Sequence, residues 1–376
     1  MNILNAFPLV LDLRKSDYKE SAPPVSALHS GNMGDIIYSL PTCDLLGVNH
    51  YIINICSDPA FLNRTISERS ARALAPLLLA QKNLSRVSVV KSNVPWESVV
   101  PKDIGVNYVL DTFRLNFANP KLHLLYQHAL PYNLHVDGSK PWMLAESFPG
   151  EEELPNHPYL VVALTPRYRR FPSSYYEELL KNIPPEAIYF VGTEFDQIER
   201  MNIAGVAYQT EDFRNLARLI AGASLFIGNP SFAYALAEAL KVKRYVGLAD
   251  YINVYPLDAR GEALHLNQVA HVKMAIYEAL GMKESAKHLI YQLQDRIEDL
   301  SAENQQLMIK NQIHTKDAND AVEHMKYLVG LHASLKYHLR QVLFLVRQNN
   351  RVFNSFIGFL KKLPGPDRVW RTFTQV

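Results

Sequence analysis

The stretch Ser224–Val246 reads SLFIGNPSFAYALAEALKVKRYV, and it predicts the fold more directly than any other part of the chain. It begins with Ser224–Ile227, which is short and apolar as a buried strand is, and it ends in a second short strand. Between the two, an alanine-rich helix is expected over Pro230–Leu240, with Asn229 as its N-cap and the proline at the first helical position. A strand, a helix and a strand of these lengths predict a right-handed βαβ unit in a parallel sheet.

The same alternation of short apolar runs and helical segments continues on both sides of this unit. Further strands are expected at Val25–Leu28, Tyr51–Cys56, Val87–Val90, Tyr108–Leu110, Tyr159–Leu164, Ala187–Val191 and Arg244–Val246. Further helices are expected at Ser67–Gln81, capped by Ser67 and kinked or divided by Pro76, at Asp212–Ala221, and after a capping box that runs from Ser174 to Glu177.

The Pro- and Glu-rich segment Ser147–Pro158 separates two such α/β regions and is predicted to be a linker and a hinge. The boundaries that follow are residues 1–150 for a first Rossmann-like domain, 159–280 for a second, and 283–376 for a helical tail. The predicted fold class is therefore α/β, with two Rossmann-like domains and a C-terminal α-helical tail.

Composition excludes several classes of protein. With 376 residues, 48% apolar content and a net charge of +2, the chain suits a globular protein and gives no electrostatic case for nucleic-acid binding. Its two cysteines form neither a metal-ligand spacing nor a disulfide framework, and no apolar run approaches the ~20 residues of a membrane-spanning helix. We expect a cytoplasmic protein without a signal peptide, a bound metal or another cofactor.

The first candidate site is the turn His29–Asp35, HSGNMGD, which follows an expected strand and begins a helix. Its two glycines allow the backbone to approach a substrate closely, so Asn32 and Gly34 are predicted to contact substrate. Asp35 stands at the helix start, where a carboxylate is favourable. It either caps the helix or takes a proton from an acceptor hydroxyl, and residue spacing alone favours capping.

Three further turns follow strands of the second α/β region, where parallel sheets bind ligands. Arg167, Arg169 and Arg170 could neutralise a diphosphate, to which Thr165 would donate a hydrogen bond from its hydroxyl, or they could form a solvated basic loop. Gly192-Thr193 closes the next strand, and Glu194 after it is expected to be an ordinary acid of a first helical turn. Asn229 and Ser231 flank Pro230 at a helix N-terminus, which is either an anion site or a well-capped helix.

The tail favours self-association. Ile290, Leu293, Ile297, Leu300, Asn304, Leu307 and Asn311 follow one another in alternating steps of three and four residues. Isoleucine at a with leucine at d favours a two-stranded coiled coil, so a homo-oligomer through 290–311 is predicted over a single amphipathic helix. A second helical segment is expected over 319–348. The segment 353–373 mixes aromatic and basic residues and packs either on a partner subunit or at a membrane surface.

The turns together resemble the heptosyltransferase-like glycosyltransferases of family 9, which have the GT-B architecture. The resemblance lies in the Gly34-Asp35 turn with its later Leu40-Pro41, in the strand and basic loop Val161–Arg170, and in the Gly228-Asn229 turn before an alanine-rich helix. It covers roughly residues 25–260, and the order of the three motifs is more specific than any one of them.

This resemblance implies an inverting, metal-independent glycosyl transfer. The first domain would bind the acceptor, with Asp35 as general base, and the second would bind the nucleotide-sugar donor through Thr165, Arg167 and the 228–231 turn. The chain departs from the family where Ala235 stands at the position of a histidine and where the usual lysine of the donor loop is not evident. The alternatives are a sugar-nucleotide epimerase and a catalytically degenerate, self-associating scaffold.

Overall fold

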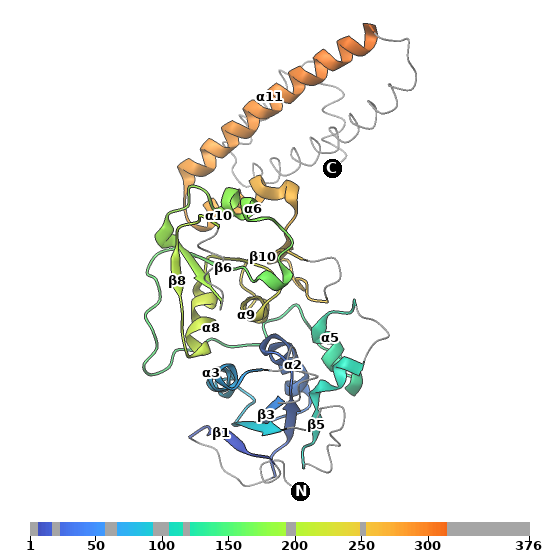
Figure 1. The fold of residues 1–376 in the computed structure, drawn as a ribbon, viewed down its shortest axis with the longest axis vertical. Helices are drawn as coiled ribbons and strands as arrows, with labels where there is room; N and C mark the ends of the chain where they lie inside the picture. The colour runs from blue at the N-terminus through green and yellow to red at the C-terminus, as the bar shows by residue number, and fades with distance from the viewer. Residues whose placement is uncertain are drawn as a thin grey trace. The chain divides into compact units, whose positions relative to one another are not determined.

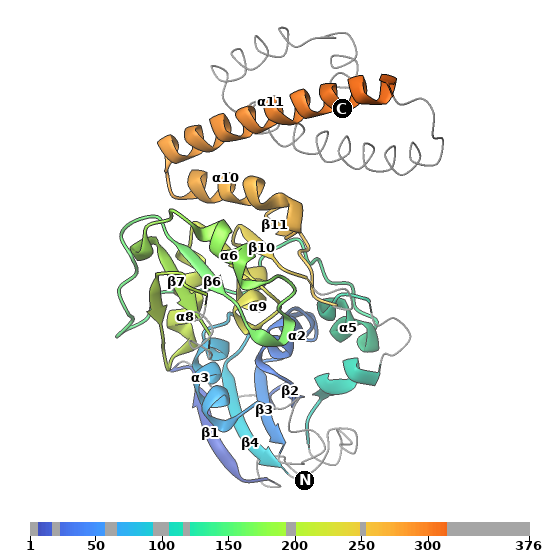
Figure 2. The ribbon, with the colours of Figure 1, turned by 45° about the horizontal axis from the view of Figure 1, so that its top comes forward.

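The computed structural model describes residues 7–16, 23–56, 66–92, 105–115, 121–192, 201–248 and 253–313, and the structural statements below concern these residues. Residues Met1–Gly281 form one compact unit and Met282–Val376 a second. The first unit contains two sheets, one mostly and one entirely parallel, with helices packed on them (Figure 1; Figure 2 gives a second view).

The first sheet has five strands in the order β1-β4-β3-β2-β5. Their bounds are β1 Leu9–Arg14, β2 Ser26–His29, β3 His50–Cys56, β4 Arg86–Ser92 and β5 Tyr108–Val109. The edge strand β1, which the sequence analysis did not predict, runs antiparallel to β4, and the other pairs are parallel. The associated helices are α2 Met33–Leu45, α3 Glu68–Leu79 and α5 Leu124–Ala129, with 3₁₀ turns η3 Leu110–Leu115 and η4 Leu130–Tyr132.

The second sheet is parallel throughout, in the order β11-β10-β9-β6-β7-β8. Its strands are β6 Leu160–Ala163, β7 Ile188–Val191, β8 Val206–Tyr208, β9 Leu225–Gly228, β10 Arg244–Val246 and β11 Gly261–Ala263. Numbered by appearance, the order is that of the Rossmann fold. Its helices are α6 Ser173–Leu180, α8 Phe213–Gly222, α9 Phe232–Ala239 and α10 Val269–Ala279, with 3₁₀ turns η5 Pro166–Tyr168, η6 Pro185–Ala187 and η7 Leu266–Gln268. The predicted fold class, two Rossmann-like α/β domains, is confirmed.

Two helix starts differ from their prediction. Helix α9 begins at Phe232 with Ser231 as its N-cap, so Asn229 and Pro230 lie before the helix. The physical reason is that the Asn229 side chain bonds the neighbouring loop instead of the helix. Helix α6 begins at Ser173 after Pro172, without a capping side chain, so the expected Ser174 capping box is absent. The cap of α3 is as predicted, because Ser67 accepts a hydrogen bond from the Ser70 amide; Pro76 does not divide this helix.

The two sheets of the first unit are joined through their helices. Helix α2 packs against α9, and α3 packs against α8. One hydrophobic cluster contains residues of both halves, among them Ile37 and Leu40 of α2 and Leu236 of α9. Trp142 bridges the halves, since its amide donates to the Ala239 carbonyl at 3.0 Å and its indole Nε1 to the Ile37 carbonyl at 3.2 Å. The halves therefore meet through apolar packing as well as through polar contacts.

The segment Ser147–Pro158, expected to be a linker, is bonded to α8. The Arg218 guanidinium donates to the Glu152 carbonyl at 2.9 Å and pairs with the Glu151 carboxylate at 2.9 Å. Arg214, in the same helix, lies 3.8 Å over the Phe148 ring. These contacts attach the segment to the second half, so the chain crosses from one half to the other just before it. Hinge motion there stays a prediction.

The second unit begins with α11, Lys283–Ile313, a helix of 31 residues that covers the predicted heptads. Ile290, Leu293 and Ile297 are partly shielded from solvent, as are Leu300 and Leu307 further along. The expected segments 319–348 and 353–373 lie outside the described residues. Within the part of the chain that the structure describes, no helix has the length and apolar character to cross a membrane.

A buried histidine in the first sheet gives the fold a predicted pH dependence. His50 Nε2 donates to Ser88 Oγ at 2.8 Å, and the Ser88 hydroxyl in turn donates to Asp12 at 2.7 Å. Burial, and then the Arg86 guanidinium, lower the pKa of His50 to about 3, whereas a histidine in the unfolded chain titrates near 6.5. The folded state therefore keeps His50 neutral while the unfolded state binds a proton.

Stability should therefore fall as the pH drops below about 6.5 and continue to fall toward pH 3. Between pH 7 and pH 5 this histidine should lower the free energy of unfolding by about 2 kcal/mol. Urea unfolding at the two pH values measures this change, and His50→Gln should remove that share of it. An equal pH dependence in wild type and His50→Gln would contradict the assignment.

Candidate functional site

Each sheet has a switch point, where neighbouring strands send their connections in opposite directions; open α/β sheets bind ligands at the carboxyl edge of such a point. In the second sheet it lies between β6 and β9, which are followed by Thr165 and Asn229. In the first sheet it lies between β2 and β5, which are followed by the turn before α2 and by Asp111. Residues predicted from sequence thus stand at both switch points.

Asn229 joins the two loops at the switch point of the second sheet. Its Oδ1 accepts the Thr165 amide N–H at 2.8 Å, and its Nδ2 donates to the Thr165 carbonyl at 2.5 Å. The residue is completely buried, and a side chain at Gly228 would meet the Ala163 carbonyl. Asn229 therefore fixes the backbone from which the Thr165 side chain projects.

The first turn of α9 follows directly. The Ser231 hydroxyl accepts the Tyr234 amide N–H at 3.2 Å, which is the capping bond of this helix. An accepting hydroxyl keeps its own hydrogen for donation, so Ser231 can cap the helix and still donate to an oxygen in the crevice. The amides of a first helical turn also present partial positive charge, which suits an anionic ligand.

The arginines predicted from the 165–170 loop diverge. Arg169 Nη1 donates to Ser173 Oγ at 3.0 Å, and Arg170 Nη1 donates to the Leu248 carbonyl at 2.9 Å. The backbone of Arg167 lies in η5, but its side chain is outside the description. Gly192 is exposed at the end of β7 with a φ of +149°, a conformation that L side chains rarely adopt. Thr193 and Glu194 lie outside the described residues.

Asp35 lies half-buried in the first turn of α2, as predicted. Asn32 is the N-cap residue, and it contributes its carbonyl, which accepts the Ile36 amide at 3.1 Å, without a capping bond from its side chain. A Cβ on Gly34 would lie 3.9 Å from the Ala235 Cβ. The first turns of α2 and α9 therefore lie against each other, and Asp35 directly follows Gly34 in the first of them.

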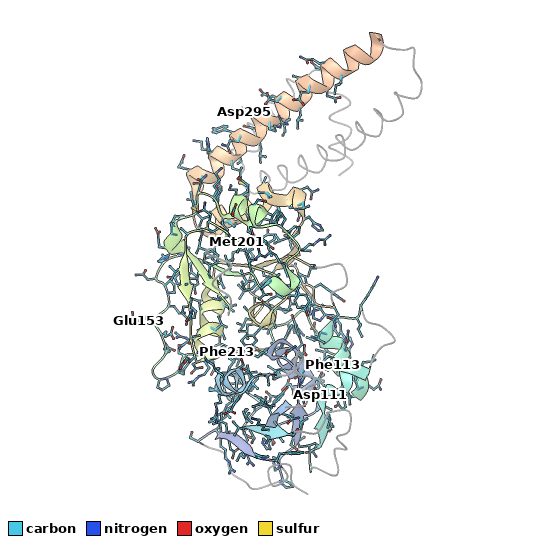
Figure 3. All side chains as sticks on the ribbon, in the orientation of Figure 1. Asp111, Phe113, Glu153, Met201, Phe213 and Asp295 are labelled. Atoms are coloured by element: carbon cyan, nitrogen blue, oxygen red, sulfur yellow. The ribbon has the colours of Figure 1, made fainter. Side chains whose placement is uncertain are left out.

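Three buried residues lie together beneath this turn: His29, with which the predicted site begins, and Asp111 and His128, which the sequence did not single out. Asp111 accepts the Ser30 amide with both carboxylate oxygens, at 3.1 and 2.9 Å. His29 Nε2 lies 3.1 Å from His128 Nε2, and all three side chains are at most 1% exposed. Asp111 lies beside α5 (Figure 3). The one signal in the sequence was the position of Asp111 just after an expected strand, which did not distinguish it from other strand-end acids.

A buried charge network fixes α9 from its other end. Glu238 pairs with Lys241 and with Arg244, both at 2.6 Å, and Asp258 pairs with Arg244 at 2.8 Å. The Tyr234 hydroxyl donates to Glu238 at 3.1 Å, and burial followed by the Glu238 charge raises the pKa of Tyr234 well above its usual value. Burial lowers the pKa of Lys241, against the opposing effect of Glu238. The network thus holds compensated charges inside the protein.

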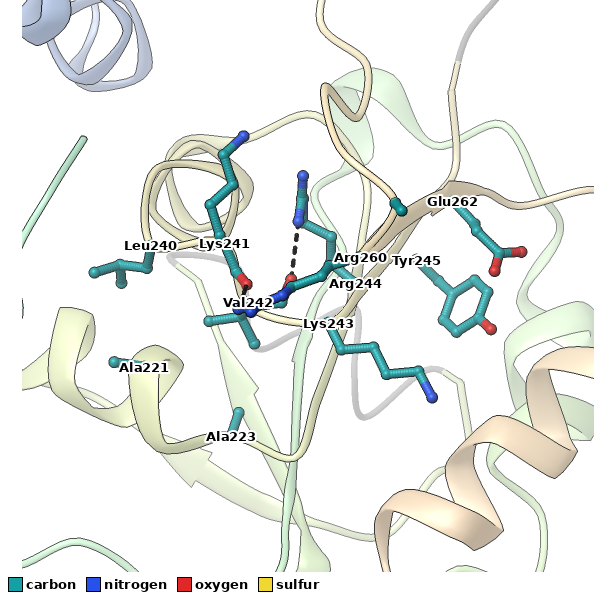
Figure 4. Close-up of a pocket in the computed structure, with 11 residues that line it drawn as sticks. Ala221, Ala223, Leu240, Lys241, Val242, Lys243, Arg244, Tyr245, Arg260 and Glu262 are labelled. Atoms are coloured by element: carbon teal, nitrogen blue, oxygen red, sulfur yellow. Dashed lines mark hydrogen bonds between the residues drawn. The ribbon is translucent and has the colours of Figure 1, made fainter. Parts of the chain in front are cut away.

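A pocket of about 520 Å³ lies at the opposite edge of the second sheet, where β10 and β11 begin (Figure 4). Three of its four cations are held by other groups of the protein: Lys241 and Arg244 belong to the buried network, and the Arg260 guanidinium donates to the Lys241 carbonyl at 3.2 Å. The carboxyl ends of α8 and α9 also lie here, and cations are favourable at such ends without any ligand. The pocket is therefore not the candidate site, which we place at the switch points. No group of metal-ligating side chains occurs among the described residues.

Comparison with known proteins gives structural neighbours only. No protein-family model matches the chain, and a search of curated proteins also finds no match. The fold is similar to a glycosyl transferase family 9 structure from Veillonella parvula, with TM-score 0.43 and 12% identity over 74% of this chain and 100% of that one. It is also similar to the Escherichia coli heptosyltransferase WaaC with ADP, with TM-score 0.40 and 16% identity over 68% and 99% of the two chains.

A third similar structure is the iron-containing dodecameric glycosyltransferase TibC of enterotoxigenic Escherichia coli, with TM-score 0.34 and 16% identity over 61% of this chain and 59% of that one. These neighbours are glycosyltransferase family 9 and heptosyltransferase structures, the same family that the sequence motifs resemble. At such scores the likeness concerns the fold and not the activity of this chain.

Proposed function

We propose that this protein is a glycosyltransferase that moves a sugar from a nucleotide-diphosphate sugar to a hydroxyl acceptor. We also propose that it acts in the cytoplasm, in the assembly of surface glycans. The observation that carries the proposal is the contact between the first turns of α2 and α9, at Gly34 and Ala235. The turn that carries Asp35, a carboxylate suited to proton removal, thus belongs to a helix that packs against α9, whose start is suited to a diphosphate. The two partners of a transfer reaction would then meet between the two switch points.

In the proposed step, Asp35 takes the proton of the acceptor hydroxyl as its oxygen attacks the anomeric carbon. The bond between that carbon and the diphosphate oxygen breaks, and the nucleoside diphosphate leaves with the electron pair. Attack from the face opposite the leaving group inverts the anomeric configuration. The proton ends on Asp35 and the negative charge on the diphosphate, so the step is balanced without a metal or another cofactor.

The second half would hold the donor. We place the diphosphate, where negative charge develops, against the first turn of α9 and the Ser231 hydroxyl. Hydrogen-bond donors that are already in position stabilise a transition state most where charge appears. Thr165 and Arg167 would contact the same group, with Arg169 beside them, and Gly192-Thr193 would lie near the nucleoside. Asn229 is assigned to fixing the Thr165 loop, since both polar atoms of its amide are already bonded to that loop.

Donor binding can be tested with thermal shift and calorimetry against UDP, GDP, ADP and their sugar conjugates. One nucleotide should stabilise the wild type; Arg167→Ala should weaken its binding roughly tenfold or more, as expected for a lost charge-assisted bond. Asp35→Ala should bind it like the wild type, because the base contacts the acceptor. If none of these compounds binds, the catalytic proposal fails and a self-associating scaffold becomes the better account.

We also propose that α11 associates with α11 of a second copy through the heptad positions of 290–311. Ile297→Asp places a charge at an a position, and light scattering after gel filtration should show a smaller assembly than the wild type. Glu298→Gln, on an exposed position of the same helix, is the matched control and should leave the mass unchanged. A wild-type chain that is monomeric at micromolar concentration would contradict this proposal. Membrane contact through 353–373 stays a prediction.

A further inference from the structure

The switch point of the first sheet contains buried polar side chains that the proposed transfer step does not use. They are His29, Ser30, Asn54, Asp111 and His128, named here the switch-point cluster. Each is at most 2% exposed. They come from the end of β2, from β3, from η3 and from α5, so four elements meet beneath the turn that leads to Asp35.

Asp111 holds the first residue of this turn. Both of its oxygens accept the Ser30 amide N–H, while Asn54 Nδ2 donates to Ser30 Oγ at 2.9 Å. A hydrogen bond to an ionised acceptor is stronger than a neutral one, and burial excludes competing water. Ser30 is therefore fixed through its backbone and its side chain at once.

His29 holds the next amide, and its Nδ1 also lies 3.4 Å from Asp111 Oδ1. With both rings neutral, one pair of tautomers satisfies the hydrogen bonds around the two histidines. The Leu124 carbonyl can only accept, so His128 Nδ1, at 2.9 Å from it, carries a proton. A neutral His128 then has an accepting Nε2, and His29 Nε2, at 3.1 Å, donates to it. His29 Nδ1 is left as an acceptor, and it receives the Gly31 amide N–H at 2.8 Å.

We propose that Asp111 and His29 are positioning residues for Asp35, an inference that rests on the proposed transferase function. Together they bind two consecutive amides, Ser30 and Gly31, just before α2 begins. The Asn32 side chain makes no capping bond, so the start of α2 depends on the residues before it. Because misplacing a reacting group by about 1 Å can cost roughly 100-fold in rate, support beneath the turn has consequences for turnover.

The test uses the full-length chain with matched pairs of variants. Asp111→Asn keeps the shape but removes the charge and one accepting oxygen. His29→Asn retains an accepting atom near the position of Nδ1, whereas His29→Gln does not. Asp12→Asn is the control, because Asp12 also accepts bonds from buried partners, Arg86 and Ser88, but belongs to the distant edge strand β1. Hydrogen exchange of residues 30–35 is read beside nucleoside-diphosphate release from UDP-glucose, GDP-mannose and ADP-glucose.

We expect exchange at Ser30 and Gly31 to rise at least about tenfold in Asp111→Asn and His29→Gln, while His29→Asn stays close to wild type. Asp12→Asn should leave this segment unchanged. With a nucleotide sugar that the wild type turns over, kcat should fall in Asp111→Asn and His29→Gln while KM stays unchanged. The kcat of His29→Asn should be close to that of the wild type. Unchanged exchange at residues 30–35, or wild-type kcat in Asp111→Asn, would overturn the proposal. If the wild type turns over none of the three donors, the transferase proposal lacks support, while the exchange result still decides whether the cluster holds the turn.

Discussion

Replacing Asp35 with Asn should lower kcat by about 10³-fold while leaving nucleotide binding as in the wild type. A positioned general base contributes roughly 10²- to 10⁴-fold to proton-transfer reactions, and Asn has a similar shape but cannot accept the proton. Asp35 lies in the first turn of α2, so the amide also keeps the polar character of that position. The measurement is nucleoside-diphosphate release with the donor selected by the binding screen, beside calorimetry of the same variant.

The control separates catalysis from helix capping. A residue that only stabilised the start of α2 would change the free energy of unfolding and leave kcat of the folded protein unaltered. Asp44, an exposed residue near the end of the same helix, provides the matched Asp→Asn substitution. Wild-type turnover in Asp35→Asn would remove Asp35 from the mechanism and return it to the capping role that spacing alone favours.

Glu238→Gln should destabilise the protein by about 3–5 kcal/mol, the range found when one partner of a buried ion pair is removed. Lys241 is 2% exposed and Arg244 is completely buried, so both cations stay inside the protein when the carboxylate is lost. Asp258 would remain as the second acidic partner of Arg244. Lys241 would lose its carboxylate partner and keep its bond to the Gly138 carbonyl and its contact with the Trp142 ring. Urea unfolding of the full chain measures the loss.

Two variants test this explanation. Lys241→Met together with Glu238→Gln should recover part of the stability, because the buried cation is removed with its partner. Glu211→Gln breaks the Arg69–Glu211 pair, in which both side chains are more than four-fifths exposed, and should have no measurable effect. A Glu238→Gln variant as stable as wild type would show that the network does not hold α9 in place.

Local sequence patterns were sufficient to predict a strand and the helix after it where an apolar run gives way to a helical pattern. The run before Gly228 and the alanine-rich segment after it predicted β9 and α9, and β2 with α2 was found in the same way. The edge strand β1 was missed because its residues are only partly buried and follow Pro8, so the apolar signal of a central strand is absent. The start of α9 was misplaced by two residues because Asn229 has a partner in another loop, at Thr165.

The residues of the candidate site also divide into those that could be predicted from sequence and those that could not. Asp35 and Ser231 stand next to sequence signals, a Gly-Asp turn and a helix start, so they could be predicted. Asp111 and Ser30 are 81 positions apart, and their contact exists because β5 lies beside β2. The roles of His29 and His128 depend on their bonds to two backbone groups, which no residue pattern encodes. Strand order therefore had to be known before the switch-point cluster could be recognised.

Hydrogen exchange with and without the nucleoside diphosphate that binds best tests the central claim most directly. A donor at the switch point of the second sheet should protect amides of 163–169 and 228–235, and leave the opposite edge, 241–245 with 260–262, as in the free protein. Protection confined to that opposite edge would place the ligand in the pocket of Figure 4 and contradict the assignment. If saturating nucleotide protects neither edge of the second sheet, the glycosyltransferase proposal itself is contradicted.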